Sequence, residues 1–224
     1  MLSLLHLCDS LFPIGGFAYS DGLEAASAAN PAPSDISALR EWMDACLDET
    51  IGRLEGPAVW QAWAAFTHED WHALTQLDEE LDALRPASSV RRSSRAMGLR
   101  LLTTWHALHP DARLETAVAL ARAGRLGPAL PIAFAGACVV SGIEWRQAVE
   151  AFAYTRLAAT VSAAMRLMPI GQTDAHRLLA RTLDRVPAVV DGIIARNGRI
   201  ESFAPALDIA AMTQQYLHSR LFRS

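Results

Sequence analysis

The stretch from Glu144 to Arg181 constrains the fold most, because its first part predicts one long helix that must be buried. Residues 144–168 are rich in the good helix formers Ala, Leu and Met and contain neither Gly nor Pro. Small residues fall on nearly every side of this helix, and a helix that is apolar almost all round is surrounded by others. At about 1.5 Å per residue it spans roughly 36 Å, about the diameter of a small domain. We therefore predict a central helix with other helices packed around it.

A sharp break follows the central helix. Pro169 and Gly171 end it. Thr173 is a candidate cap for a second helix that begins at Asp174, since an acidic residue suits a helix N-terminus. We expect this shorter helix to pack back on the first.

The rest of the chain also carries helical patterns, and no period-two alternation is long enough for a strand. After a turn at residues 30–35, Ser34 is a candidate cap for a helix to about residue 51. Gly56-Pro57 is expected to break that helix and start the next, and Thr67 to cap the one after. The remaining expected helices cover 3–9, 21–29, 88–108, 111–123, 128–142, 187–196 and 205–217. The predicted fold class is all-α, a single compact domain (1–224) of about ten helices around the long central helix.

The composition excludes several classes of protein. With 224 residues, 51% of them hydrophobic and 20% charged, the chain can bury a substantial core and is not disordered. A net charge of −4 gives no reason to expect nucleic acid or a membrane as a partner. The N-terminus lacks the basic region of a signal peptide. Cys8, Cys46 and Cys138 form no metal-binding pattern and are interpreted as reduced thiols. We expect a soluble, cytoplasmic protein.

An apolar loop, DSLFPIGGFAYSDG at residues 9–22, precedes the helix at 21–29. Pro13, Gly15 and Gly16 forbid a regular helix there. Its large apolar residues are Leu11, Phe12, Ile14, Phe17 and Tyr19. A loop this apolar either packs under other elements or binds a partner, and the residues alone leave both interpretations open. Ser20 or Asp21 is the candidate cap of the helix that follows.

His68-Glu69-Asp70-Trp71-His72 matches the HExxH motif. On one helix this motif places two His on one face for zinc, with the Glu as general base. The extended form of the motif needs Gly three residues after the second His, where this chain has Thr75. The acidic run that follows is typical of a solvated face. Both features count against a zinc hydrolase, which is kept only as an alternative function.

No other catalytic pattern stands out in the sequence. There is no GxSxG nucleophile elbow and no glycine-rich phosphate loop. A chain short of catalytic motifs and rich in apolar segments broken by Pro and Gly favours a binding or scaffolding protein over an enzyme.

Four segments, in order, resemble one family. The segments LCDSLFPIGGFAYSDGLEAA, SSRAMGLRLL, RLMPIGQTDAHRLL and DIAAMTQQYLHSRLFRS are similar to the opening, the mid-chain helix, the break after the long helix and the C-terminus of the urease accessory protein UreF family. The HExxH pentapeptide is not part of that pattern.

The resemblance implies an all-α, cytoplasmic, non-catalytic protein that forms a homodimer. It implies a complex with the accessory protein UreD (UreH in some organisms), on which the GTPase UreG docks and nickel is delivered to apo-urease. No cofactor is expected to bind tightly, and nickel only passes through the complex. The partner-binding residues that the resemblance implies are Pro13, Ile14, Gly15, Phe17, Tyr19, Ser20, Gly171, Gln172, Arg220, Leu221 and Phe222.

Two positions depart from the family pattern. Gln214-Gln215 stands where His-Glu is frequent, and His176 where a second Gln is usual. Any role of those groups toward nickel or a partner is therefore in doubt here.

The C-terminal SRLFRS is expected to become ordered only against a partner, although its apolar residues could instead pack into the chain's own core. A GTPase regulator that supplies Arg220 or Arg223 to UreG is a further alternative.

Overall fold

The computed structural model describes residues 1–29 and 35–223. Its α-helices are α1 (Leu2–Cys8), α2 (Leu23–Ser27), α3 (Ile36–Ala45), α4 (Gly56–His68), α5 (Trp71–Ala83), α6 (Ser88–Leu108), α7 (Ala112–Arg122), α8 (Leu130–Val140), α9 (Trp145–Leu167), α10 (Gln172–Leu183), α11 (Val186–Ala195) and α12 (Pro205–Thr213). Two 3₁₀ turns, η1 (Gly16–Ala18) and η3 (Gln214–Tyr216), and a π-helical segment, η2 (Cys46–Glu55), complete the elements. Within the described ranges there is no strand, only an isolated bridge between Tyr19 and Arg223. The predicted all-α fold is confirmed.

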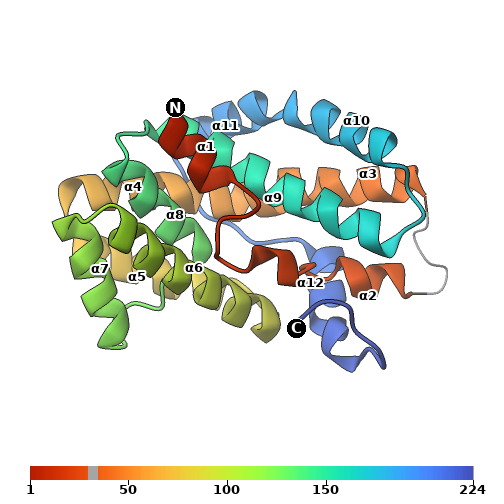
Figure 1. Ribbon diagram of the computed structural model, residues 1–224, viewed down its shortest axis with the longest axis horizontal. Coiled ribbons are helices and arrows are strands. Elements are labelled where there is room, and N and C mark those ends of the chain that lie inside the picture. Colours follow the sequence, from red (N-terminus) through yellow and green to blue (C-terminus); the bar gives the residue numbers. More distant parts are fainter. Residues whose placement is uncertain (30–34, 224) are drawn as a thin grey trace.

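The predicted central helix is α9. It runs through the middle of the molecule, with α10 and α11 along one side and α2 on the other (Figure 1). Its small residues, such as Ala148 and Ala164, are fully buried against the neighbouring helices. Phe152 is also fully buried, and its ring meets that of Phe134 on α8 edge to face, 5.3 Å between centroids. Close approach at small residues and aromatic packing between them hold the bundle together.

The predicted break after the central helix is also confirmed, but the predicted cap is not. The backbone of Met168 is extended, and α10 begins at Gln172 and packs back on α9. The N-cap is Gly171, which has no side chain to accept a hydrogen bond, so the expected Thr173 cap is wrong. Thr173 lies inside the first turn instead.

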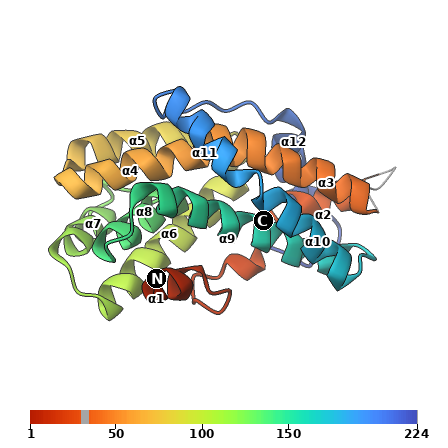
Figure 2. The ribbon, with the colours of Figure 1, turned by 90° about the horizontal axis from the view of Figure 1, so that it is seen from above.

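The expected break at Gly56-Pro57 is wrong. Residues 36–68 form one continuous helical rod, in which η2 joins α3 to α4 (Figure 2). The backbone of Gly56 stays helical at φ −64° and ψ −48°, and its N–H donates to the Ile51 carbonyl five residues back. Pro57 has no N–H to donate, but it sits where the pattern changes from π to α, so the rod continues. The expected cap at Ser34 and the turn at 30–34 lie outside the described residues; Asp35 caps α3 by accepting from Ala38 N–H at 2.9 Å.

The HExxH pentapeptide does not lie on one helix. α4 ends at His68, Glu69 takes the left-handed conformation at φ 54°, and α5 begins at Trp71. Asp70 caps α5 by accepting from Ala73 N–H, so the expected Thr67 cap is wrong; the Thr67 hydroxyl donates to its own helix instead. His68 and His72 therefore belong to different helices, and the geometry that the zinc hydrolase interpretation requires is not formed.

Candidate functional site

The apolar loop at residues 9–22 has side chains in the core and side chains at the surface. Phe12 is buried in the core and Ile14 packs against it, whereas Phe17 is 63% exposed. The chain turns at Gly15, with φ +80°, and again at Gly22, with φ +96°. A Cβ on Gly22 would lie 2.6 Å from the backbone nitrogen of Ala211, so α12 crosses the start of α2 at backbone contact. The loop therefore packs under other elements at Phe12 and Ile14, whereas Phe17 is left at the surface.

The C-terminal tail docks on this loop and on α2. Phe222 is buried, and the N–H groups of Leu221 and Phe222 both donate to the carboxylate of Glu24, the latter at 3.1 Å. Arg223 N–H donates to the carbonyl of Ala18 at 2.8 Å. The expectation that the tail becomes ordered only against a partner is therefore wrong. Glu24 is itself only 6% exposed. A buried carboxylate needs hydrogen-bond donors, and the N–H groups of Leu221 and Phe222 supply them.

Arg166, near the end of α9, ties the loop to the tail. Its guanidinium lies 4.5 Å from the ring centroid of Phe17 and 4.3 Å from that of Phe222. It also donates to the carbonyl of Phe17 at 3.2 Å. Stacking on two rings and a hydrogen bond fix the planar guanidinium between them. The central helix therefore sets the position of the exposed Phe17 ring.

Gln214, a departure from the family pattern, is the polar centre of the same region. It is 3% exposed, and its carbonyl oxygen accepts from Ser20 Oγ at 3.2 Å and from Gly22 N–H at 3.0 Å. Its amide nitrogen donates to Glu24 at 3.5 Å and to the Arg223 carbonyl at 3.3 Å. The residue that the sequence leaves in doubt thus fastens α12 to the loop and the tail.

The structure brings together most of the residues that the resemblance implied. Phe17 and Phe222 both contact Arg166, Tyr19 forms a bridge with Arg223, and Ser20 shares Gln214 with the tail. We call residues 13–20 and 220–222 the loop–tail surface. Its inner members are Ser20 and Phe222, and its outer members Phe17 and Leu221 are 63% and 55% exposed. Gly171 and Gln172 are exposed at the start of α10, and none of their contacts within the described ranges reaches this surface.

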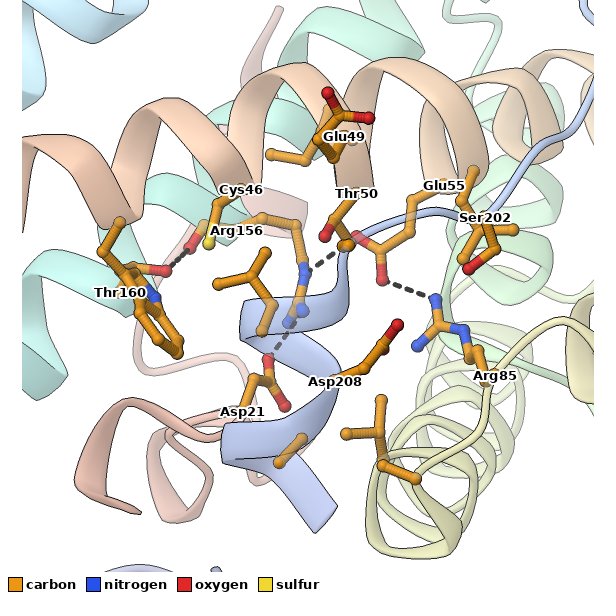
Figure 3. Close-up of a pocket in the computed structure, with 18 of the residues that line it drawn as sticks. Asp21, Cys46, Glu49, Thr50, Glu55, Arg85, Arg156, Thr160, Ser202 and Asp208 are labelled. Atoms are coloured by element: carbon orange, nitrogen blue, oxygen red, sulfur yellow. Dashed lines mark hydrogen bonds and ion pairs between the residues drawn. The ribbon is translucent and has the colours of Figure 1, made fainter. Parts of the chain in front are cut away.

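A chain of buried charges lies behind the loop (Figure 3). Arg156 of α9 pairs with Asp21 at 2.6 Å and with Glu55 of η2 at 3.1 Å, and Glu55 also pairs with Arg85 at 2.6 Å. Burial alone would lower the pKa of Arg156, but the two carboxylates outweigh it and raise that pKa. Asp21 is held in the left-handed conformation at φ 50°, so this ion pair fixes a strained point of the loop. An Arg in the middle of an otherwise apolar helix was the available sequence signal.

No constellation for catalysis is found among these groups. The three cysteines are free, and burial raises the pKa of Cys8 to about 11 and that of Cys46 to about 12, so these thiols are protonated and unreactive at neutral pH. Among the described residues, no group of three or more His, Cys, Asp or Glu is arranged to hold a metal ion. None of the helices in those ranges is long and apolar enough to cross a bilayer.

The fold and site thus define an all-α protein whose candidate site is a surface formed by an apolar loop and the C-terminal tail. A family model described as UreF matches residues 34–183. A urease accessory protein UreF of Methylibium petroleiphilum is 34% identical over all of this chain and 94% of its own length. The corresponding protein of an Azoarcus species is 31% identical, again over all of this chain and 95% of its own. The chain belongs to the UreF family.

One relative is longer than this chain. The bifunctional urease accessory protein UreEF of Bordetella bronchiseptica is 32% identical over all of this chain but over only 52% of its own length. The match therefore covers about half of that protein.

Proposed function

We propose that this chain is a non-catalytic cytoplasmic scaffold in urease maturation. It binds the accessory protein UreD (or UreH), and the GTPase UreG docks on their complex, from which nickel is delivered to apo-urease. Nickel is cargo in this proposal, and no cofactor is bound tightly. The alternatives of a zinc hydrolase or a GTPase-stimulating arginine gain no specific observation from the structure.

One observation carries the proposal: the exposed side chains of Phe17 and Leu221 are presented by a backbone that is already fixed. The Arg166 guanidinium stacks on the Phe17 ring, and the Glu24 carboxylate accepts from the Leu221 N–H. Interface hot spots are enriched in aromatic residues and Arg, and a pre-ordered surface loses less conformational freedom on binding. The likeness to urease accessory proteins over the whole chain supports the same partner class.

Co-purification with tagged candidate UreD and UreG tests the proposal. The double variant Phe17→Ser, Leu221→Ser removes both exposed anchors and leaves the contact of Arg166 with the buried Phe222 ring in place. Leu108→Ser is a matched control, because Leu108 is also exposed, at 52%, but lies at the end of α6. We expect the native chain and the control to retain UreD, and the double variant to lose at least about tenfold in affinity. Equal retention by all three would reject the loop–tail surface as the interface.

Self-association is the second part of the proposal, since the resemblance implies a homodimer. Light scattering at micromolar concentration is expected to give about twice the chain mass of 24.3 kDa. A mass equal to that of one chain throughout this range would reject the dimer without touching the proposed UreD contact.

A further inference from the structure

The cavity beside the Asp21–Arg156 ion pair is not explained by the proposed scaffold. It has a volume of about 70 Å³ and lies between η2, α9 and α12 (Figure 3). At about 15 Å³ per molecule this space holds roughly five waters, or one small organic molecule. Phe203, which lines it, is 76% exposed, so the cavity lies next to the protein surface on that side.

One wall of the cavity is the π-helical segment η2. Its hydrogen bonds run between residues five apart, so residues spaced by four or five stack along one face. Cys46, Thr50 and Glu55 follow this spacing, and all three line the cavity. π-helical turns are rare and occur frequently at functional sites, because the widened turn re-aims side chains. The π-helical part of the rod 36–68 thus directs several polar side chains into the cavity.

The charges in the cavity are nearly balanced. Arg156 and Arg85 pair with Asp21 and Glu55, and Asp208 of α12 remains without an ion pair among the described residues. Arg85 is 7% exposed, and its Nε has no hydrogen-bond partner in the same part of the chain. Figure 3 shows the Asp208 carboxylate directed toward the Arg85 guanidinium. A buried donor without a hydrogen-bond partner therefore faces a half-buried carboxylate that forms no ion pair within the described ranges.

Burial and the charge of Arg85 have opposite effects on the pKa of Asp208. Burial raises the pKa of the Asp208 carboxyl, and the positive charge of Arg85 acts against that rise. The fourth carboxylate at the cavity, Glu49, is already paired with Arg53 at 3.1 Å and adds no free charge. A bound anion would be attracted by Arg85 but repelled by Asp208, and a bound cation the reverse. A neutral group with both a donor and an acceptor can pair with both groups without repulsion.

We propose that this cavity binds a small neutral molecule bearing a carboxamide-type group. Its carbonyl oxygen accepts from Arg85, and its N–H groups donate to Asp208. The hydrocarbon part of the ligand contacts the apolar walls formed by Trp42 and Leu207. Small-molecule sites are typically apolar hollows with a few placed polar groups, and this one has that composition. The inference does not depend on the proposed scaffold function.

Three planar probes of nearly equal shape and different charge test the proposal: acetamide, acetate and acetamidinium. Each is titrated into the full chain, and amide and indole signals are followed by NMR, with the Trp42 indole identified from a Trp42→Phe variant. We expect saturable shifts at Trp42 with acetamide at a Kd of about 1 mM, which is in keeping with the limited binding energy of a four-atom ligand. The two charged probes should bind at least about tenfold more weakly.

The Asp208→Asn variant supplies the second arm, because it keeps the side-chain shape and removes the charge. It should lower the preference for acetamide over acetate at least about fivefold, since the repulsion of the anion is gone. Asp191→Asn, an exposed carboxylate on α11, is the control and should change nothing. Absence of saturable shifts at Trp42 would mean a cavity that holds water only and would overturn the proposal. Equal binding of the three probes, or an unchanged preference in Asp208→Asn, would overturn it as well.

Discussion

The carboxylate of Glu24 accepts the backbone N–H of Phe222 at 3.1 Å, across 198 residues of sequence. Both groups are buried, with Glu24 6% and Phe222 4% exposed. Helix α2 and the C-terminal tail are thereby one structural unit. This unit carries the loop–tail surface, so we expect loss of tail docking to weaken the proposed partner binding as well.

The two apolar residues of the tail should differ sharply in their effect on stability. Phe222→Ala is expected to lower the free energy of unfolding by about 3–5 kcal/mol, because the ring is buried and stacked on Arg166. Leu221→Ala should cost less than about 1 kcal/mol, because that side chain is 55% exposed. Urea unfolding of the two variants measures the difference. Equal small losses would show that the tail is not docked in solution.

Replacing Glu24 by Gln should cost about 1.5–3 kcal/mol. The carboxylate accepts from Leu221 and Phe222, and an amide of the same shape turns an N–H donor toward these donors. Glu80→Gln, an exposed position on α5, is the control and should stay within about 0.5 kcal/mol of the native chain. Thermal unfolding of both variants checks this, and a Glu24→Gln chain as stable as the control would contradict the tail contact.

Arg156→Met should destabilise the chain by about 3–5 kcal/mol. The substitution keeps the apolar stem but leaves Glu55, 2% exposed, and Asp21 without their shared partner. Arg146→Met, on the same helix, breaks only exposed pairs with Glu150 and Asp191 and should cost about 1 kcal/mol or less. Denaturant unfolding compares the two. A similar loss in both would mean that the buried network is not stabilising.

His72→Ala should leave urease activation unchanged and alter stability by less than about 0.5 kcal/mol. His72 is exposed, and a helix break separates it from His68, so no zinc geometry is lost. Metal analysis of the purified native chain accompanies the test. One zinc per chain that disappears in the variant would restore the hydrolase interpretation.

The sequence predicts the helices well where local chemistry decides and poorly where tertiary contacts do. The central helix and its end at Pro169 follow from helix propensity and the special backbone of Pro and Gly. The break at Gly56-Pro57 does not occur, since a π-helical stretch bridges it, and Gly56 is packed so that a Cβ would lie 2.7 Å from Ile193. No local pattern signals such a contact.

The candidate site was predicted only in part for the same reason. The loop and the tail carry recognisable segments, so Phe17, Tyr19, Ser20, Leu221 and Phe222 could be named from the sequence. Their supports could not, because Glu24, Gln214 and Arg166 act through partners 149 to 198 residues away. Residue type alone does not show whether a Glu or Gln is buried or exposed, and this becomes visible only in the fold.

The most direct test of the central claim is restoration of urease activity in cells that lack their UreF-family gene. The cells carry the cognate urease and the other accessory genes, and urease activity is measured with and without added nickel. We predict that the native chain and Leu108→Ser restore nickel-dependent activity, whereas the Phe17→Ser, Leu221→Ser variant, folded and equally abundant, does not. If the native chain is folded and abundant but activity stays at the level of the deletion strain, the proposed role in urease maturation is wrong.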